Sequence, residues 1–455
     1  MARIAIIGAG PAGFYASEEL LGQGFEVDLY DALPTPFGLV RAGVAPDHPK
    51  IKAVTKRYAK TAKKPGFRFF GGVELGEHVR REELLERYHG VVYAFGTATD
   101  NRLGIPGEDL AGSHAATEFV AWYNAHPVFA RHSFDLSTER AVVIGNGNVA
   151  IDVARMLVLS PEELRTTDTA DHAIDALAGA GVREVVVLGR RGPAQAAFTN
   201  PELRELGELS RADVVVDPAE VELDPDSRAW LGSDAADATA RRNVEILAGY
   251  AQRAPTGHSH RVALRFLRSP VEILGDEQGH VRGVRVVRNR IERHDDGRLA
   301  AVPTGEEEVI ECGLVLRSIG YRGIPVCSVP FDERRGLIPN DAGRVVGDDG
   351  GPLPGEYAVG WIKRGPSGVI GTNKKDAADT VAAILEDREA GRLNAPARPD
   401  PDSLEPWLRE RAPGLVTWEG WGAIDLHETT AGEPHGRPRV KLVDLDEMSR
   451  VATGR

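Results

Sequence analysis

The clearest hydrophobic pattern of the chain lies in its first thirty-one residues. Residues 3–7 form a short apolar run that ends at a glycine, and residues 8–13 form a G-x-G-x-x-G turn. Residues 14–21 then place apolar side chains at helical spacing, and residues 26–30 form a second apolar run that ends at Asp31. Because short apolar runs bounded by glycine are typical of buried strands, the pattern predicts strand, turn, helix and strand in that order.

This turn has the spacing of a dinucleotide-binding motif. In such a motif Gly8 allows the tight turn, Gly10 lets a pyrophosphate approach the backbone, and Gly13 lets the helix pack on the strand. The helix N-terminus attracts phosphate, and an acid at the end of the second strand accepts hydrogen bonds from an adenosine ribose. An ordinary strand-to-helix turn has the same local pattern, and the motif alone does not distinguish FAD from NAD. The residues predicted for this site are Gly8, Gly10, Pro11, Ala12, Gly13 and Asp31.

A second unit of the same kind begins at residue 141. Residues 141–145 form an apolar run, residues 145–150 read G-x-G-x-x-A, and a helical pattern follows. The next apolar run, residues 184–188, ends in Arg190 and Arg191, where the first unit has an acid. Arginine at this point pairs with a 2′-phosphate, so the sequence predicts NADP rather than NAD. A pair of surface arginines after a strand is the alternative.

Residues 50–64 carry a run of lysines with no acid among them. Lys52, Lys56 and Lys60 recur at four-residue spacing, which predicts a basic stripe along one face of a helix. Since the whole chain is acidic, this stripe is either a solvated helix face or a docking surface for an acidic partner. The predicted apolar face of the same helix consists of Ile51, Val54, Tyr58 and Ala62.

The remaining pattern predicts further strands and one hairpin. Residues 262–266 and 281–287 alternate in polarity around a turn signal and predict an antiparallel hairpin. A third glycine-rich turn, residues 363–376, precedes a helix that reaches about residue 385, and its backbone N–H groups are placed to hold the edge of a flavin ring. Residues 222–242 are polar and acidic, which predicts a surface element. Additional strands are predicted at residues 67–73, 90–96, 314–319 and 357–362.

Composition narrows the class of protein. The chain has 455 residues, enough for two large domains or three smaller ones, and a formal charge of −13 that argues against general nucleic-acid binding. No apolar run is long enough for a membrane span, and the first strand leaves no room for a signal peptide. The two cysteines, Cys312 and Cys327, form neither a C-x-x-C pair nor a zinc set. We therefore expect a cytoplasmic globular protein.

Two nucleotide-binding units in one chain predict two dinucleotides. FAD in one unit and NADPH in the other would make a flavin-linked path for hydride. Glu202 and Glu205 lie one helical turn apart soon after the arginine pair, where they are either nicotinamide contacts or ordinary exposed glutamates. Trp361 either flanks a cofactor or packs in the core.

Several longer motifs extend this interpretation, namely residues 33–41, 43–52, 143–150, 189–193, 360–366, 368–376 and 432–441. With these motifs the chain resembles the adrenodoxin-reductase-type ferredoxin–NADP reductases. The resemblance implies a two-domain α/β flavoprotein with two Rossmann-like domains, as in glutathione reductase. It implies an FAD domain of residues 1–103 and 323–455, with an NADP domain of residues 104–322 inserted in it. Asp31 stands where the family usually has glutamate, and Phe37 replaces a tryptophan.

The resemblance also implies roles for matching residues. NADPH would pass hydride to FAD, which would release single electrons to a ferredoxin. The basic stripe of Lys52, Lys56 and Lys60 is the candidate docking surface for that partner. His48, Glu202 and Glu205 would lie near the nicotinamide, for proton handling or positioning. The implied FAD contacts are Ala12, Asp31, Leu39, Leu75, Trp361, Gly368, Val369 and Ile370. The implied NADP contacts are Asn146, Gly147, Asn148, Val149, Arg190, Arg191, Glu202 and Gly368.

Three other classes of protein share parts of this pattern. A flavin disulfide reductase has the same two-nucleotide plan but needs a cysteine pair beside the flavin. An electron-input subunit, like the small subunit of glutamate synthase, usually carries cysteine-rich cluster motifs, which two cysteines cannot supply. A nucleotide sensor without enzymatic activity would bind NADPH but would not reduce a flavin.

Overall fold

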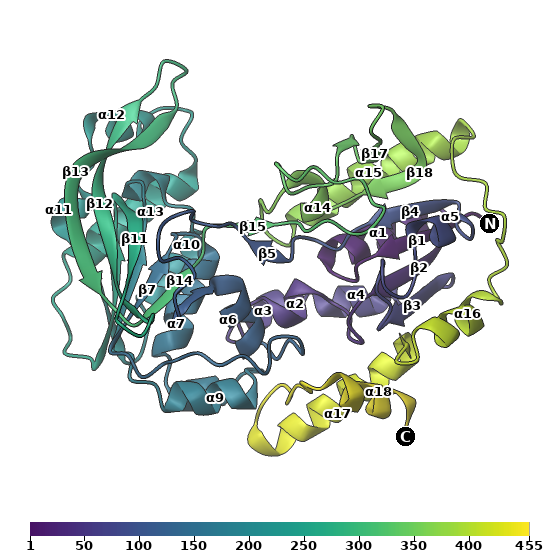
Figure 1. The fold of residues 1–455 in the computed structure, drawn as a ribbon, viewed down its shortest axis with the longest axis horizontal. Helices are drawn as coiled ribbons and strands as arrows, with labels where there is room; N and C mark the ends of the chain where they lie inside the picture. Colours follow the sequence, from purple (N-terminus) through teal and green to yellow (C-terminus); the bar gives the residue numbers. More distant parts are fainter. Residues whose placement is uncertain (455) are drawn as a thin grey trace. The chain divides into compact units, whose positions relative to one another are not determined.

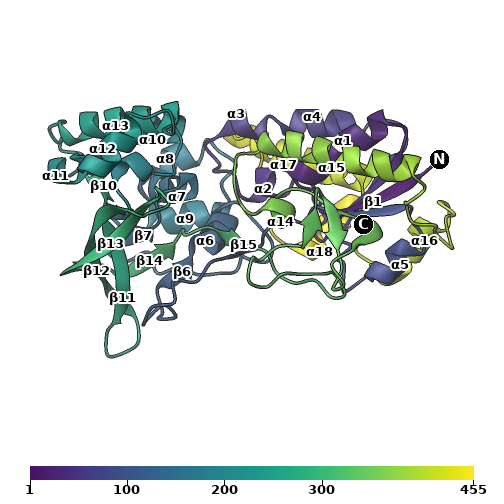
Figure 2. The same ribbon diagram turned by 90° about the horizontal axis from the view of Figure 1, so that it is seen from above.

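The computed structural model describes residues 1–454 and divides the chain into two compact units (Figures 1 and 2). Unit 1 comprises Met1–Thr99, Asn124–Pro127 and Gly320–Arg455, and unit 2 comprises Asp100–Tyr123 and Val128–Ile319. Unit 2 therefore interrupts unit 1 in the sequence. The chain changes units beside the two-residue strands β5 (Thr99–Asp100) and β15 (Tyr321–Arg322).

Unit 1 is built on an eight-stranded sheet in the order β16-β17-β18-β4-β1-β2-β3-β19. Its central strands, from β18 to β3, are parallel, and antiparallel strands complete both edges. The register Arg3↔Glu26 to Ile7↔Tyr30 brings the carboxyl ends of the first two strands together. The strands are β1 (Arg3–Ile7), β2 (Glu26–Asp31), β3 (Phe67–Gly71), β4 (Gly90–Tyr93), β16 (Asn340–Asp341), β17 (Arg344–Val346), β18 (Pro352–Ala358) and β19 (Val416–Thr417).

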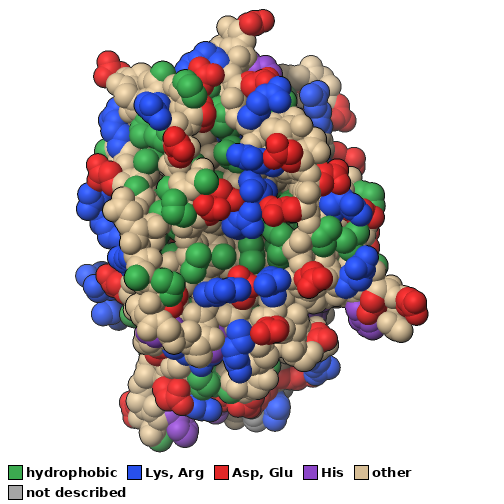
Figure 3. Space-filling model, turned by 90° about the vertical axis from the view of Figure 1, so that its left-hand side faces the viewer, with side chains coloured by type: hydrophobic (Ala, Val, Ile, Leu, Met, Phe, Trp, Pro, Cys, Tyr) green, Lys and Arg blue, Asp and Glu red, His purple; other side chains and the backbone are tan. Residues whose placement is uncertain are grey.

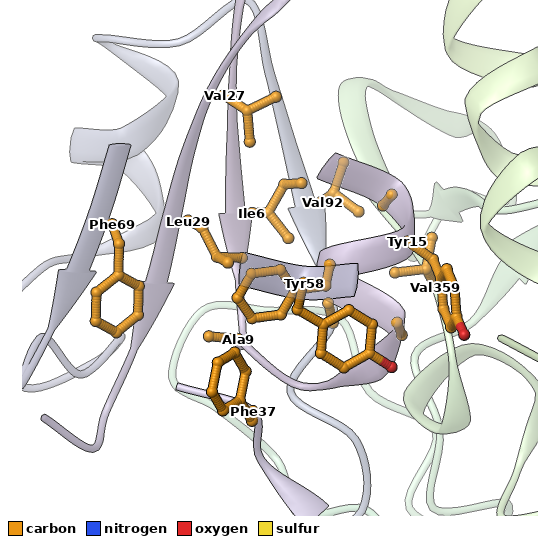
Figure 4. Close-up of a cluster of buried hydrophobic side chains, with 14 of the residues drawn as sticks. Ile6, Ala9, Tyr15, Val27, Leu29, Phe37, Tyr58, Phe69, Val92 and Val359 are labelled. Carbon is orange, nitrogen blue, oxygen red and sulfur yellow. The ribbon is translucent and has the colours of Figure 1, made fainter. Parts of the chain in front are cut away.

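Helices cover this sheet, and buried aromatic side chains fill the space between the helices and the strands. Figure 4 shows Tyr58 and Phe37 in the same cluster of buried side chains as Ile6 and Leu29 of the central strands. Phe14 stacks on Tyr58 with ring centroids 4.8 Å apart. Such rings each bury a large apolar area, so they dominate the packing energy of this layer. The helices are α1 (Pro11–Gly22), α2 (Leu39–Ala42), α3 (Pro49–Lys52), α4 (Thr55–Thr61), α5 (Arg81–Leu85), α14 (Trp361–Arg364), α15 (Thr372–Glu389), α16 (Leu404–Arg411), α17 (Trp418–Gly432) and α18 (Leu445–Thr453).

Unit 2 has a six-stranded parallel sheet in the order β6-β14-β7-β8-β10-β9, and a separate antiparallel sheet, β11-β12-β13. The strands are β6 (Ser113–Ala115), β7 (Arg140–Ile144), β8 (Glu184–Leu188), β9 (Ala212–Val216), β10 (His260–Arg265), β11 (Arg268–Gly275), β12 (Val281–Arg293), β13 (Leu299–Glu311) and β14 (Leu314–Arg317). The helices are α6 (Ala116–Tyr123), α7 (Asn148–Val158), α8 (Pro161–Leu164), α9 (Asp171–Ala178), α10 (Asn200–Leu206), α11 (Pro218–Val221), α12 (Pro225–Leu231) and α13 (Ala238–Ala251).

Three predicted elements differ in the structure. Residues 262–266 are not half of a hairpin, because β10 pairs in parallel with both β8 and β9; the hairpin partner of β12 is β11. The predicted strand 357–362 ends at Ala358, and Trp361 begins α14. The basic helix is interrupted by a turn at residues 53–54, so α3 and α4 share its residues.

The apolar face of that basic segment is also less buried than predicted. Tyr58 is 1% exposed, but Ile51 is 41% exposed. Only the α4 part of the segment is therefore anchored in the core.

Among residues 1–454, no helix is both long and apolar enough to cross a bilayer. On the face drawn in Figure 3, Lys and Arg side chains lie among Asp and Glu, with no extended patch of one sign.

Candidate functional site: two glycine-rich turns

The first glycine-rich turn joins β1 to α1 in the predicted way. Gly8 has φ +115°, and a side-chain carbon there would lie 2.6 Å from the backbone of Ala94, so only glycine fits. At Gly10 the same test finds no atom nearer than Gly38 Cα at 4.0 Å, which leaves open space over the turn. Because α1 begins at Pro11, its free N–H groups lie at this open point.

Asp31 supports the turn as well as ending β2. Its carboxylate accepts hydrogen bonds from Ala9 N at 2.8 Å and Leu33 N at 2.9 Å. Burial raises the pKa of Asp31 to about 6, and the two backbone hydrogen bonds oppose that rise. A carboxylate so buried gains from additional donors, such as the hydroxyl groups of a ribose.

Two distant segments converge on the first turn. Gly38, which precedes Leu39 of α2, lies so near the turn that a side-chain carbon there would be 2.9 Å from Gly10 Cα. A side-chain carbon at Gly360, just before Trp361, would be 2.6 Å from the Cβ of Ala12. The structure thus brings the predicted residues Ala12, Leu39 and Trp361 to one end of the unit 1 sheet.

Buried polar atoms without partners support a ligand at this end. Within residues 1–454, Trp361 Nε1 and Thr97 Oγ1 are buried and have no hydrogen-bond partner. A buried polar group left unpaired costs about 1–3 kcal/mol, so both atoms favour a bound polar group. The open turn, the buried acid at the end of β2 and these two atoms fit FAD.

Asp376 fixes the segment that carries Trp361. Its carboxylate accepts hydrogen bonds from Gly360 N at 2.5 Å and from Lys363 Nζ at 3.0 Å. The next residues of the segment, Gly368 and Val369, are exposed, and Val369 N donates to Thr372 Oγ1 at 3.1 Å at the start of α15. Of the other predicted FAD contacts, Leu75 is buried and Ile370 is half-buried.

The second glycine-rich turn joins β7 to α7 in unit 2. Gly145 has φ +128°, and a side-chain carbon there would lie 2.0 Å from Ser318 O. Gly147 has no neighbouring atom within 4 Å of such a carbon, which again leaves space for a phosphate. Asn148 begins α7, and its Oδ1 accepts a hydrogen bond from Thr199 N at 2.8 Å, so the turn is tied to the chain before α10.

The two arginines after β8 have no acidic partner. Within residues 1–454, neither Arg190 nor Arg191 forms an ion pair or a side-chain hydrogen bond, and Arg190 is exposed while Arg191 is half-buried. Burial and the charge of Arg190 lower the pKa of Arg191. The backbone of the pair is held instead, since Asn289 Nδ2 donates to Arg190 O at 2.7 Å. Two adjacent unpaired guanidinium groups are suited to a phosphate.

The three residues predicted to lie near a nicotinamide belong to different units. Glu202 and Glu205 share one face of α10 in unit 2; Glu202 is buried, and Glu205 pairs with Arg155 at 2.6 Å. His48 lies in unit 1, where it is buried and immediately precedes α3.

Sequence reasoning assigned no role to the basic tail of residues 432–441. In the structure, Arg439 Nη1 donates to Glu428 at 3.0 Å, and Lys441 Nζ donates to Arg41 O at 3.0 Å and Asn124 O at 3.2 Å. The tail thereby holds α2, which carries Leu39, against α17. The sequence signals were the basic residues of this irregular segment and its place among the motifs of the family resemblance.

Comparison with known proteins agrees with this geometry. A family model described as pyridine nucleotide-disulphide oxidoreductase matches residues 2–186. The NADPH-ferredoxin reductase FprA of Mycobacterium tuberculosis is 51% identical, over 99% of both chains. The mitochondrial NADPH:adrenodoxin oxidoreductase of Salvelinus fontinalis is 41% identical, over 99% of this chain and 91% of its own. The solved structure of M. tuberculosis FprA in complex with NADPH is 50% identical in sequence. The match covers 100% of each chain and has a TM-score of 0.93.

The fold and its two glycine-rich turns thus define an oxidoreductase of the pyridine-nucleotide class, and the predicted fold class is confirmed. More narrowly, the chain belongs to the family of NADPH-ferredoxin reductases that also includes the adrenodoxin oxidoreductases.

Proposed function

We propose that this protein is an NADPH-dependent ferredoxin reductase that contains FAD. The observation that carries the proposal is the contrast between the two turns: the strand after the first turn ends in Asp31, whereas the strand after the second ends at Leu188 and is followed closely by Arg190 and Arg191. An acid suits the free ribose hydroxyls of FAD, and arginines suit the 2′-phosphate of NADPH. When bound, FAD supplies the chemistry, because it accepts electron pairs and releases single electrons.

Unit 1 would hold FAD, with the residues of 1–103 and 323–455 as its domain. Gly10 and the N-terminus of α1 bind the pyrophosphate, and Asp31 binds the ribose. Trp361 Nε1 donates to a polar atom of the cofactor, which satisfies an otherwise unpaired buried donor. Asp376 orients Trp361 through Gly360 N. The further contacts proposed are Gly8, Pro11, Ala12, Gly13, Leu39, Leu75, Gly368, Val369 and Ile370.

Unit 2 would hold NADPH, with residues 104–322 as its domain. The turn of Asn146, Gly147, Asn148 and Val149 binds the pyrophosphate at the N-terminus of α7, and the two arginines bind the 2′-phosphate. Glu202 and Glu205 position the nicotinamide end, and Arg155 fixes Glu205. His48 handles a proton or positions the nicotinamide; no bond-breaking role is assigned to it.

The electron acceptor would be a small acidic iron–sulfur protein of the ferredoxin class. The exposed lysines of α3 and α4 support this, since Lys56 and Lys60 form no ion pair within residues 1–454. Lys52 is half-buried and donates to Asn124 Oδ1 at 3.3 Å, so it contributes less to this surface than its sequence spacing predicts. Opposite charges on two partners speed their encounter, particularly at low salt.

The proposal is tested by reduction of cytochrome c with NADPH, with and without an added acidic ferredoxin. Strong stimulation by the ferredoxin supports delivery of single electrons to an iron–sulfur partner. If NADPH bleaches the flavin but ferredoxin gives no stimulation, the acceptor is of another class. If NADPH binds without bleaching any flavin, the protein is a nucleotide sensor and the proposal fails.

A further inference from the structure

Two arginines and a histidine meet at the amino ends of three neighbouring strands of the unit 2 sheet. Arg183 precedes β8, Arg211 precedes β9, and His260 begins β10, which lies between those two strands. The parallel register fixes this order: Arg261 N donates to Arg183 O at 2.9 Å. On the other side of β10, His260 N donates to Arg211 O at 3.2 Å. Strand pairing therefore brings together three side chains that lie far apart in the sequence.

The imidazole of His260 is buried, and both arginines donate to the same nitrogen. Arg183 Nη1 lies 3.0 Å from His260 Nε2, and Arg211 Nη2 lies 2.7 Å from it. Because a guanidinium group only donates, Nε2 carries a lone pair, and Nδ1 then donates to Ser259 Oγ at 2.8 Å. Burial and the two arginines lower the pKa of His260 to about 4. The neutral imidazole thus holds two cations together without compensating their charge.

Neither arginine has an acidic partner. Within residues 1–454, Arg183 and Arg211 form no ion pair, and the buried Nε of Arg211 has no hydrogen-bond acceptor. Burial and the charge of Arg183 lower the pKa of Arg211, and the opposing charges of Glu163 and Glu162 do not restore it. Two guanidinium groups held in this way favour an oxyanion that accepts hydrogen bonds from both.

A cavity of about 730 Å³ opens at this point, with Arg183 and His260 in its lining. An acid of the same lining does not compensate Arg183, because Glu184 already pairs with Arg140 and, at 2.7 Å, with Arg261. The cavity is much larger than a phosphate ion, so it also has room for the organic part of a small phosphate ester.

The other acids of the lining are engaged or exposed. Asp213 accepts a hydrogen bond from Thr256 Oγ1 at 2.7 Å and lies 3.6 Å from His258 Nδ1. Glu139 and Glu311 are exposed, so water and salt screen their charge. Arg183 and Arg211 are therefore the cations of this region that are left without a counter-ion.

We propose that Arg183, Arg211 and His260 form a binding site for a phosphate group, either inorganic phosphate or the phosphate of a small monoester. Its oxygens accept from both guanidinium groups, including Nε of Arg211. The five residues of β8 put about 16 Å between this site and the arginines that follow the other end of the strand. The proposal is therefore independent of the NADPH site and of the proposed function.

The test is calorimetric titration of the FAD-loaded protein with inorganic phosphate and, separately, with ribose 5-phosphate. A saturating concentration of NADP⁺ is present, so that the other arginine pair is occupied. Replacing Arg183 and Arg211 together by Gln should weaken binding at least roughly 10-fold, because two charge-assisted contacts are lost. Arg261→Gln is the matched control: it lines the same cavity but already pairs with Glu184, so its affinity should stay within about 3-fold of the wild type.

The two probes distinguish the sources of the phosphate group. Tighter binding of ribose 5-phosphate identifies a monoester, and equal or tighter binding of inorganic phosphate identifies the free ion. If neither probe binds, or if the double variant binds as tightly as the wild type, the proposal is overturned.

Thermal unfolding gives a second readout that separates binding from folding. In phosphate-free buffer Arg211→Gln should melt no lower than the wild type, because the substitution removes an uncompensated cation. Millimolar phosphate should raise the melting temperature of the wild type, since a ligand of the folded state stabilises it, but should leave that of Arg211→Gln unchanged. Equal increases in both proteins would show that phosphate acts elsewhere, which contradicts the proposal.

Discussion

Arg41 donates two hydrogen bonds to the carboxylate of Glu428, a residue 387 positions later in the chain. The Glu428 side chain is fully buried, and it also accepts hydrogen bonds from Arg439 at 3.0 Å and from Leu442 N at 2.9 Å. Arg41 follows closely after Leu39 on α2. The C-terminal part of the chain therefore fixes the loop that we propose lies along FAD.

Replacement of Glu428 by Ala should destabilise the protein strongly. It would leave the Arg41 charge buried without its partner, and breaking a buried ion pair in this way typically costs about 3–5 kcal/mol. The expected result is a lower urea midpoint together with faster loss of FAD on dilution. Glu405→Ala is a matched control, because Glu405 is an exposed partner of Arg409 and should change the midpoint little. Equal midpoints for the two variants would contradict the role of the Arg41–Glu428 pair.

Glu428 should also make the protein sensitive to acid. Burial tends to raise its pKa, but Arg41 and Arg439 outweigh that effect and hold the pKa of Glu428 below its usual value of 4.5. The folded state therefore binds this proton less readily than the unfolded chain does. The stabilisation is complete above pH 4.5 and is lost as the pH falls through the lower, folded-state pKa.

Urea midpoints between pH 7 and pH 3 measure this effect. The wild type should lose stability below about pH 4.5, and Glu428→Gln should show a smaller loss because it has no proton to take up at this site. Parallel curves for the two proteins would show that Glu428 does not contribute.

The arginine pair should decide between the two nicotinamide cofactors. Replacement of Arg190 and Arg191 by Ala removes charge-assisted contacts worth about 1.5–3 kcal/mol each, so the KM for NADPH should rise by roughly ten- to a hundredfold per contact. The KM for NADH, which lacks the 2′-phosphate, should change far less. Steady-state reduction of ferricyanide measures both constants, and equal losses with the two cofactors would exclude a phosphate-reading role.

The exposed lysines of α3 and α4 allow a separate test of the proposed ferredoxin-docking surface. Charge reversal in Lys56→Glu and Lys60→Glu should slow ferredoxin-dependent cytochrome c reduction by roughly 5- to 10-fold at low salt, and less at high salt. Ferricyanide reduction should be unchanged, because that small acceptor needs no docking surface. Arg398→Glu, at another exposed basic side chain, serves as the control. If the lysine and control variants couple equally well to ferredoxin, the segment is an ordinary solvated surface.

Asp376 should be needed for retention of FAD. Asp376→Asn removes the negative charge that Lys363 pairs with and weakens the hold on Gly360, so Trp361 loses its support. We expect a lower ratio of flavin absorbance to protein absorbance after gel filtration, with partial recovery when excess FAD is added. A full flavin content would show that Gly360 and Trp361 are held by packing alone.

Much of the nucleotide-binding part could be read from the sequence because its determinants are local. The G-x-G-x-x-G and G-x-G-x-x-A turns depend on backbone angles and close contacts within about thirty residues, and Gly8 and Gly145 adopt the positive φ values that such turns require. Asp31 ends one strand and the arginine pair follows another, and the same local pattern predicts where both strands end. For these reasons the fold class was predictable.

Tertiary structure decided the features that depend on distant partners. Residues 262–266 have a pattern that suits either a hairpin or a parallel strand, and only packing against β8 and β9 selects the parallel position. The contacts of the basic tail, residues 432–441, depend on partners outside it, because Arg439 binds Glu428 and Lys441 binds the backbone of Arg41. The sequence by itself determined the two turns, because short-range sterics fix them; the tertiary structure determined which segments close over them, because burial of charge and apolar surface depends on the whole fold.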